Sequence, residues 1–312
     1  MSGNRPARRR AGRLPAAGAA VAAATAAVTI GGLGCTAAGS APAGEPPREP
    51  TAAQWETLEH AESLLIGPCM EAKGFRYTVV PPAEQLPRQP DFPYGIDDTE
   101  FARTHGFGTD LDRELLSRAE KDPNRVYFQG LDASQRAAYS VAMTGSERQR
   151  IKVTLPSGFR IATNDSGCLA EARRRLYGDY PAWFKAARTV ENLKTVWQSK
   201  ALEDPAYVAA VKDWSACMAG HDWTVKDPQE LRVKASAAAR EVPTETELAR
   251  ERAAAEAEAA CARTTGLVTS ATRVEQRYRA QLEQTHGDAI RTRDRLAAAA
   301  LPCARQLVDD AR

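Results

Sequence analysis

Apolar side chains recur every three or four residues along much of the chain that follows residue 52. Two stripes are the clearest, one made of Trp55, Leu58, Ala61 and Leu65 and the other of Tyr207, Val211, Trp214 and Met218. This spacing places the side chains of each stripe on one face of an α-helix, where they can pack against a core. The pattern therefore predicts a mainly helical domain.

Polar residues mark the starts of several helices. Asp204 followed by Pro205 suits the N-cap and the first helical position of the helix that carries the second stripe. Capping boxes are expected at two further places, Thr244 with Glu247 and Asp132 with Gln135. We expect a helix to begin at each of these three positions.

One segment has the two-residue period of a β-strand. Residues 151–155 alternate apolar and polar side chains, residues 157–158 can form a turn, and residues 159–161 resume the alternation. From residue 244 onward the composition shifts to Ala, Glu and Arg, and Val274, Tyr278 and Leu282 form one apolar stripe. The predicted fold class is therefore mainly α with a small β element (α+β), ending in a long C-terminal helical hairpin.

The first 34 residues have the layout of an export signal peptide. Five arginines and no acidic residue lie among residues 1–13, and residues 14–34 contain no charged side chain. The uncharged run is also long enough to span a bilayer, so a retained signal anchor is the alternative. Export through the general or the twin-arginine route is left open.

Cys35 follows this signal directly. The stretch Gly32-Leu33-Gly34-Cys35 resembles the lipobox of bacterial lipoproteins, although Gly32 stands where that family usually has leucine. The resemblance implies that the Cys35 thiol receives a diacylglycerol thioether and that the chain is cut just before it. The proline-rich residues 36–50 have the composition of an extended tether. Cleavage after Ala43 is the alternative and would give a secreted protein.

The charge of the exported part argues against binding to nucleic acid. The sequence has 42 Lys and Arg against 40 Asp and Glu, and five of the arginines precede Cys35, which leaves 37 basic against 40 acidic residues, or −3. A mildly acidic chain whose basic residues are mixed with acids lacks the basic patch of nucleic-acid-binding proteins.

A short internal repeat suggests how the remaining cysteines pair. Residues 69–77 (CMEAKGFRY) and 217–225 (CMAGHDWTV) share the pattern C-M-x-x-x-[GD]-[FW]-x-[YV]. A helix expected later in each half carries another cysteine, Cys168 or Cys261. Four cysteines allow three connectivities, and the repeat favours Cys69–Cys168 and Cys217–Cys261. Cys303 is then left without a partner in the chain, and the two alternatives are a buried free thiol and a bridge to a second chain.

Three segments resemble those of actinobacterial secreted lipoproteins: C-M…G-F-x-Y over residues 69–77, G-C-L-A-E-A over 167–172, and W-x-x-C-M over 214–218. The resemblance spans roughly residues 55–225 and implies a location at the extracytoplasmic face of the cell membrane. It implies no activity. We expect a signal peptide over 1–34, a tether over 35–52, a disulfide-stapled α-rich domain over 53–242, and a helical hairpin or arm packed on it over 243–312.

No motif of a known active site is present. The four histidines, His60, His105, His221 and His286, lie outside the usual metal-binding and nucleophile motifs, and no cysteines form a C-x-x-C pair. We therefore assign no catalytic residue, metal or cofactor. The working hypothesis is a binding or structural module of the cell envelope.

The alternative function is that of a cell-envelope enzyme, such as a wall-directed hydrolase, and a pocket that gathers histidines or acids would favour it. The expected partners are the membrane, through the lipid anchor, and a protein or wall component of the envelope. The oligomeric state is not predicted. Two candidate contact surfaces are the C-terminal arm and the proline-rich residues 81–110, in which a short helix from Asp98 to His105 is expected to end at Gly106.

Overall fold

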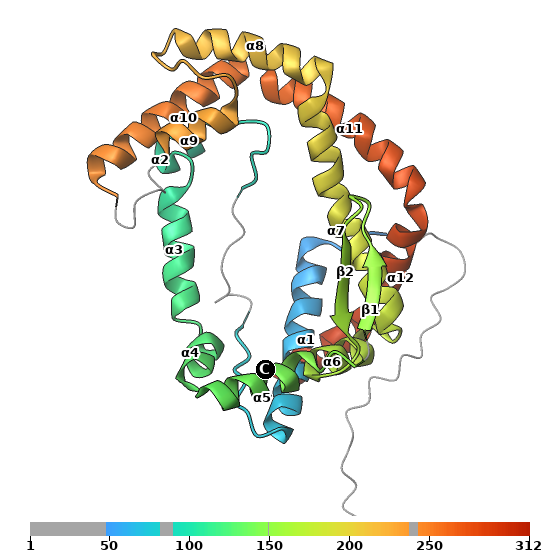
Figure 1. Cartoon of the computed structure of the whole chain (residues 1–312). Coiled ribbons are helices and arrows are strands. Elements are labelled where there is room, and N and C mark those ends of the chain that lie inside the picture. The colour runs from blue at the N-terminus through green and yellow to red at the C-terminus, as the bar shows by residue number, and fades with distance from the viewer. Residues whose placement is uncertain (1–47, 82–89, 149, 237–242) are drawn as a thin grey trace, which may run out of the picture. The chain divides into compact units, whose positions relative to one another are not determined.

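The computed structural model describes residues 48–81, 90–148, 150–236 and 243–312, all of which belong to one compact unit (Figure 1). Of these residues, 72% are helical. The elements are α1 (Ala52–Ala72), α2 (Thr99–His105), α3 (Thr109–Glu120), α4 (Pro123–Gly130), α5 (Ala133–Thr144), β1 (Arg150–Thr154), β2 (Arg160–Asn164), α6 (Cys168–Tyr177), α7 (Tyr180–Glu203), α8 (Pro205–Ala219), α9 (Pro228–Ala235), α10 (Glu245–Thr265), α11 (Leu267–Thr285) and α12 (Gly287–Asp310). The predicted fold class, mainly α with a small β element, is confirmed.

The predicted helix starts follow the expected cap chemistry. At the start of α10, the Thr244 hydroxyl accepts a hydrogen bond from the Glu247 N–H at 3.2 Å, and the Glu247 carboxylate accepts one from the Thr244 N–H at 2.8 Å. The Asp204 carboxylate accepts a hydrogen bond from the Ala206 N–H at the start of α8. Helix α5 also begins with a capping box, and Gly106 caps the end of α2. These side chains satisfy backbone groups that a helix end would otherwise leave unpaired.

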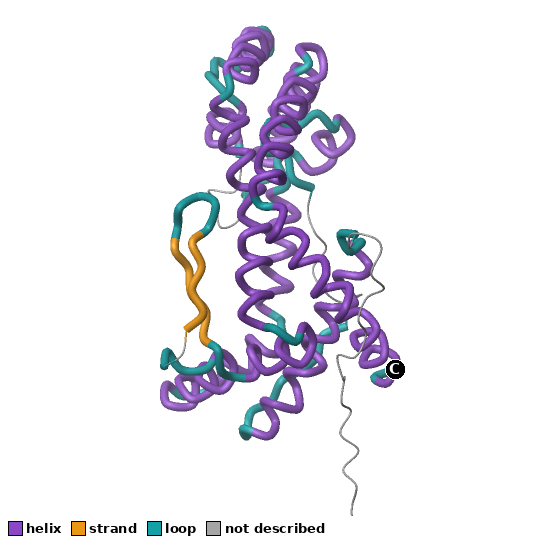
Figure 2. The backbone as a smooth tube through the Cα atoms, turned by 90° about the vertical axis from the view of Figure 1, so that its right-hand side faces the viewer, coloured by secondary structure: helices purple, strands orange, loops and turns teal. Residues whose placement is uncertain are grey.

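The predicted hairpin is the sheet of the described part of the chain (Figure 2). Strands β1 and β2 pair antiparallel, in a register that runs from Arg150 opposite Asn164 to Thr154 opposite Arg160. Ile151 points inward and is buried, while its neighbours in β1 are more exposed. The two-residue period therefore gives the hairpin one face that packs on the helices.

The helices enclose two main hydrophobic cores. The first core is formed by α1, α5, α6, the first half of α7 and α12, and its large buried residues include Leu58, Met70, Tyr180, Phe184 and Leu296. The second core is formed by α8, α9, α10 and α11, and its large buried residues include Tyr207, Trp214, Met218, Leu231 and Leu267. Helix α7 supplies residues to both, because its last turn places Ala201 in the second core.

The C-terminal segment contains three described helices, and all three pack on the rest of the domain. Helices α10 and α11 contact α8 and belong to the second core. Helix α12 contacts α1, α6 and α7 and belongs to the first core. The segment is therefore shared between both cores.

The described part of the proline-rich segment also packs inward. Tyr94, Ile96 and Ala102 are buried. The carboxylate of Glu251, itself buried in α10, accepts hydrogen bonds from the Phe107 N–H at 3.0 Å and from the Thr109 hydroxyl at 2.7 Å. Residues 82–89 lie outside the described part. The structure therefore does not test the prediction that residues 81–110 form a contact surface.

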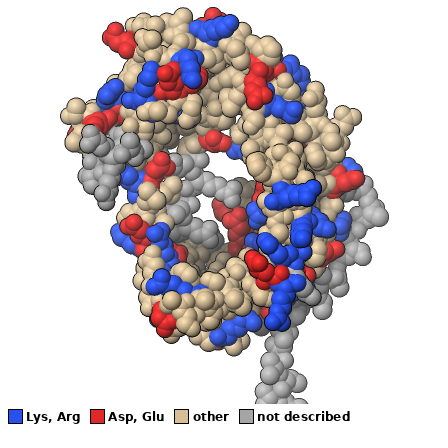
Figure 3. Space-filling model, viewed as in Figure 1, with Lys and Arg blue, Asp and Glu red and all other residues tan. Residues whose placement is uncertain are grey.

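Charged side chains of both signs are interspersed on the face shown in Figure 3. Many form ion pairs within one helix, such as Arg118 with Glu114 and Arg279 with Glu283. This distribution is that of a solvated surface, as the mixed sequence pattern predicted.

Candidate functional site

The strongest candidate for a binding site is a pocket of about 370 Å³ where α1, α6, α7 and α12 come together. Helix α1 begins with a capping box at Thr51 and Gln54, and the helical period then brings Trp55, Glu59 and Glu62 to one face. The volume falls within the range of roughly 300–1,000 Å³ that is typical of small-molecule sites.

Helices α6 and α7 supply the opposite wall. Gly178 ends α6, and Asp179 caps α7 by accepting a hydrogen bond from the Ala182 N–H at 2.9 Å. The short connection places Tyr177, at the end of α6, against Trp183, in the first turn of α7. Their rings stack with centroids 3.7 Å apart and planes 11° from parallel.

Trp55 completes an aromatic lining. Its ring lies 6.0 Å from that of Trp183, tilted by 39°, and it is only half-buried, whereas Tyr177 and Trp183 are buried. Burial, and to a smaller extent the nearby Glu62 carboxylate, raise the pKa of Tyr177 well above its usual value, so its hydroxyl stays neutral. The stacked pair is thus a rigid apolar backing, and Trp55 is the most exposed of the three rings.

The arginines that line the pocket are each paired with a carboxylate. The Arg173 Nε contacts both oxygens of Glu62, at 3.1 and 3.0 Å, and both side chains are more than four-fifths buried. Arg188 contacts Glu191 at 2.6 Å, at the exposed rim. Arg293 contacts Asp294 at 2.8 Å and lies 5.8 Å from the Trp55 ring. The lining therefore carries charges that are balanced locally.

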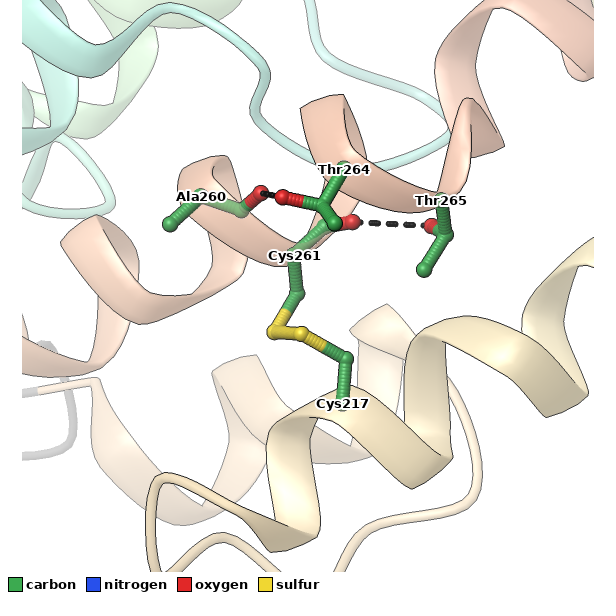
Figure 4. The surroundings of a disulfide bond; sticks show 5 residues. All are labelled: Cys217, Ala260, Cys261, Thr264 and Thr265. Carbon is green, nitrogen blue, oxygen red and sulfur yellow. Dashed lines mark hydrogen bonds between the residues drawn. A yellow bond between two sulfur atoms is a disulfide. The ribbon is translucent and has the colours of Figure 1, made fainter.

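The predicted disulfides are confirmed. Cys69 in α1 is bonded to Cys168, the first residue of α6, with a Cα–Cα distance of 5.6 Å. Cys217 in α8 is bonded to Cys261 in α10, with a Cα–Cα distance of 5.7 Å (Figure 4). Each bridge therefore fixes one helix of the repeat to a later helix of its own core, as the repeat predicted.

The prediction of a free thiol at Cys303 is wrong, because Cys303 is disulfide-bonded. That prediction rested on counting the five cysteines that follow Cys35, of which the repeat pairs four. Cys35, the predicted lipid attachment residue, lies outside the described residues.

One group of side chains has the composition of a metal site. A sulfur atom each of Cys217 and Cys261 and a ring nitrogen of His221 lie within 4.8 Å of one another. The two sulfurs are joined to each other, however, and a disulfide does not supply the thiolates that bind zinc. In this oxidised form the group is a structural disulfide next to the exposed side chain of His221.

The histidines that sequence analysis singled out are dispersed. His105 is the last residue of α2 and lies 2.8 Å from Asp110 in α3, and His221 lies in the turn after α8. His60 is partly buried in α1, and His286 joins α11 to α12. Of the four, all within the described ranges, none lines the aromatic pocket.

Sequence analysis did not identify the pocket residues. Trp55 was assigned to the core stripe of α1, and Glu59 and Glu62 were not singled out. The spacing of one tryptophan and two glutamates at intervals of four and three residues was the available signal. It places the three side chains on one face of a helix, but it does not tell which arginines and rings from α6, α7 and α12 meet them.

Comparisons with protein-family models, with curated proteins and with solved structures found no match. Among the described helices, none combines the length and the apolar character needed to cross a membrane.

Proposed function

We propose that this protein is a binding module of the cell envelope, held at the extracytoplasmic face of the membrane by a lipid on Cys35. The observation that carries the binding role is the aromatic pocket between α1, α6, α7 and α12. It combines a partly exposed ring, a rigid aromatic backing and polar groups at the rim, which is the composition of a small-ligand site.

The two disulfides support the extracytoplasmic location. Cys168 and Cys261 are fully buried, and each is bonded to a cysteine on a neighbouring helix. Structural disulfides persist mainly in oxidising compartments outside the cytosol. An export signal followed by a disulfide-stapled domain is a consistent pair of features.

The anchor rests on the lipobox-like Gly32 to Cys35 and on the tether composition of residues 36–50. Two acyl chains hold a protein stably at a membrane, at about 0.8 kcal/mol for each buried methylene. The competing arrangements are a secreted form cut after Ala43 and a form retained by an uncleaved signal anchor.

Mass spectrometry of the membrane-purified protein tests the anchor. We expect the mature chain to begin at Cys35 and to carry the mass of a diacylglyceryl group. An unmodified start at Gly44 would refute the anchor and support secretion. A peptide in which Cys35 is linked to Cys303 would refute it as well, because a sulfur in a disulfide cannot also form the lipid thioether.

A wall-directed hydrolase is the second candidate, because three glutamates, Glu59, Glu62 and Glu191, line the pocket. Glycosidic hydrolysis needs one carboxyl group that holds a proton for the leaving group. Glu62 pairs with Arg173 and Glu191 pairs with Arg188, so both carboxylates are already engaged within the chain. These ion pairs favour binding over hydrolysis.

Incubation of the protein with purified cell-wall material distinguishes the two roles. We expect the protein to sediment with the wall material and to release no soluble fragments. Release of sugar or peptide fragments that is lost in Glu59→Gln, Glu62→Gln or Glu191→Gln variants would replace the binding role with the hydrolase.

A further inference from the structure

The charge balance of the pocket restricts what it can hold. Arg173, Arg188 and Arg293 each pair with a carboxylate of this chain. An anionic ligand would have to displace those carboxylates and would face Glu59, Glu62 and Glu191. A quaternary ammonium ligand would find aromatic rings, but it would meet three guanidinium groups in the same lining. The site therefore suits an uncharged ligand.

The polar groups suit a ligand with many hydroxyls. A guanidinium group has five N–H donors and a carboxylate has about four acceptor positions, so an ion pair leaves part of each unused. The exposed Arg188–Glu191 pair lies at the rim, where Arg188 also lies 6.0 Å from the Phe184 ring. A hydroxyl group both donates and accepts, so neighbouring hydroxyls can bond to Glu191 and Arg188 without separating them.

The aromatic groups suit a ligand with one apolar face. Trp55 is half-buried and stands tilted beside the stacked Tyr177–Trp183 pair. The C–H groups on one face of a pyranose ring pack well on an indole ring, while the hydroxyls at the ring edge point outward to polar side chains. The pocket presents both kinds of group at once.

We propose that this pocket binds an uncharged pyranose glycan, with one sugar ring stacked on Trp55 and its hydroxyls bonded to Arg188 and Glu191. The inference rests on the proposed binding function and narrows it to one ligand class. In the cell envelope, this class corresponds to the neutral polysaccharide segments of the wall or capsule.

Calorimetric titration of the full-length protein in detergent tests the ligand class. The probes are neutral oligosaccharides (maltohexaose, cellohexaose, mannohexaose and chitohexaose), with tetramethylammonium chloride and inorganic phosphate as charged probes. We expect saturable binding of at least one neutral oligosaccharide, accompanied by a change in tryptophan fluorescence, and no binding of either charged probe.

Two variants locate the binding in the pocket. Trp55→Leu removes the stacking ring and is expected to weaken the binding about tenfold or more. The double variant Arg188→Ala and Glu191→Ala removes the rim pair without touching the core and is expected to have a similar effect. The matched control is Arg279→Ala with Glu283→Ala, a surface ion pair of similar exposure on α11, which should leave the affinity unchanged. Unchanged binding in both pocket variants would overturn the proposal.

The outcomes separate this inference from the function on which it rests. Failure of every neutral oligosaccharide to bind overturns the glycan assignment. Binding of tetramethylammonium or phosphate that depends on Trp55 overturns the glycan assignment as well but keeps the binding module. Cleavage of a bound oligosaccharide overturns the non-catalytic role and keeps the glycan assignment.

Discussion

The ends of α1 and α8 show the same backbone construction in two different settings. In the first, the Met70 carbonyl accepts hydrogen bonds from the N–H groups of Lys73 and Phe75, each at 3.0 Å. In the second, the Met218 carbonyl accepts them from His221 at 2.9 Å and Trp223 at 3.1 Å. Both are Schellman-type helix ends, in which an aromatic residue folds back toward the helix.

The surroundings of the two helix ends differ in what the buried side chains do. The first core is rich in aromatic rings and opens into the candidate pocket. In the second core, α10 packs through alanines and carries two fully buried glutamates, Glu251 and Glu258, toward the segment over residues 92–109. The repeat therefore supplies a common frame. The residues outside it line the candidate pocket in one half and hold the segment over residues 92–109 in the other.

Removal of either disulfide should have the largest effect on stability. The bridges close chain segments with sequence separations of 99 and 44 residues. Loop-closure entropy then predicts a loss of about 4.7 kcal/mol for Cys69→Ala with Cys168→Ala and about 4 kcal/mol for Cys217→Ala with Cys261→Ala. Urea denaturation measures both free energies of unfolding. A larger loss of stability on removal of Cys217–Cys261 would show that contacts in the folded protein, rather than the entropy of the unfolded chain, set the difference between the two bridges.

A glycine beside the first bridge should be nearly as sensitive. Gly167 precedes Cys168 and has a φ of +87°, and a Cβ placed on it would lie 2.3 Å from the Gly145 N and 2.7 Å from the Thr144 carbonyl carbon. Gly167→Ala should therefore cost at least about 3 kcal/mol, from backbone strain and overlap together.

Gly178→Ala is the matched control for this overlap. Gly178 has a φ of +74°, and a Cβ there would have no heavy atom of the described residues within 4 Å. It should cost about 1 kcal/mol, which is the conformational part alone. Urea denaturation measures the free energy of unfolding of both variants. Similar losses would show that the close approach of Gly167 to Gly145 adds nothing to the cost of a Cβ at residue 167.

Local signals in the sequence predicted much of this frame. Caps such as Thr244 with Glu247 act through backbone groups three residues apart, so the sequence contains both partners. The repeat identified both disulfides, because each half reuses one backbone geometry. The pocket was missed, since it joins α1 to α6, α7 and α12 across long sequence separations. Cys303 was misassigned because its free thiol was inferred from a count of cysteines, and no local pattern around Cys303 tests such a count.

Buried Glu258 in α10 makes the stability of the second half depend on pH. Burial raises the pKa of Glu258 from 4.5 to about 7, although the Arg232 guanidinium opposes the shift. Between these values the folded protein holds a proton that the unfolded chain releases, so stability falls as the pH rises and the full penalty is present above about pH 7. Glu258→Gln removes the charge and should stabilise the protein by up to about 3 kcal/mol above that pH.

Thermal unfolding followed at about pH 5 and about pH 8.5 tests this sign. The gain in melting temperature for Glu258→Gln should be large at the higher pH and small at the lower one. Glu256→Gln, at an exposed position of the same helix, should change neither value. A gain that is equal at both pH values would mean that Glu258 does not titrate in this range.

The smallest effects should come from the one position at which the two helix ends differ in backbone chemistry. Gly74 and Asp222 occupy the same place in the repeat, with φ of +81° and +64°, and Asp222 is the non-glycine residue with positive φ in the described part of the chain. Glycine adopts this region freely, whereas a residue with a Cβ is destabilised there by about 1 kcal/mol, and aspartate by somewhat less.

Gly74→Ala should therefore destabilise the first half by about 1 kcal/mol, because no described heavy atom lies within 4 Å to give the new methyl group a favourable contact. Asp222→Gly should stabilise the second half by about 0.5 kcal/mol, reduced by the greater freedom of glycine in the unfolded chain. Urea denaturation measures the free energy of unfolding of both variants. A change in the same direction for both would mean that backbone strain at this shared position does not set their stability.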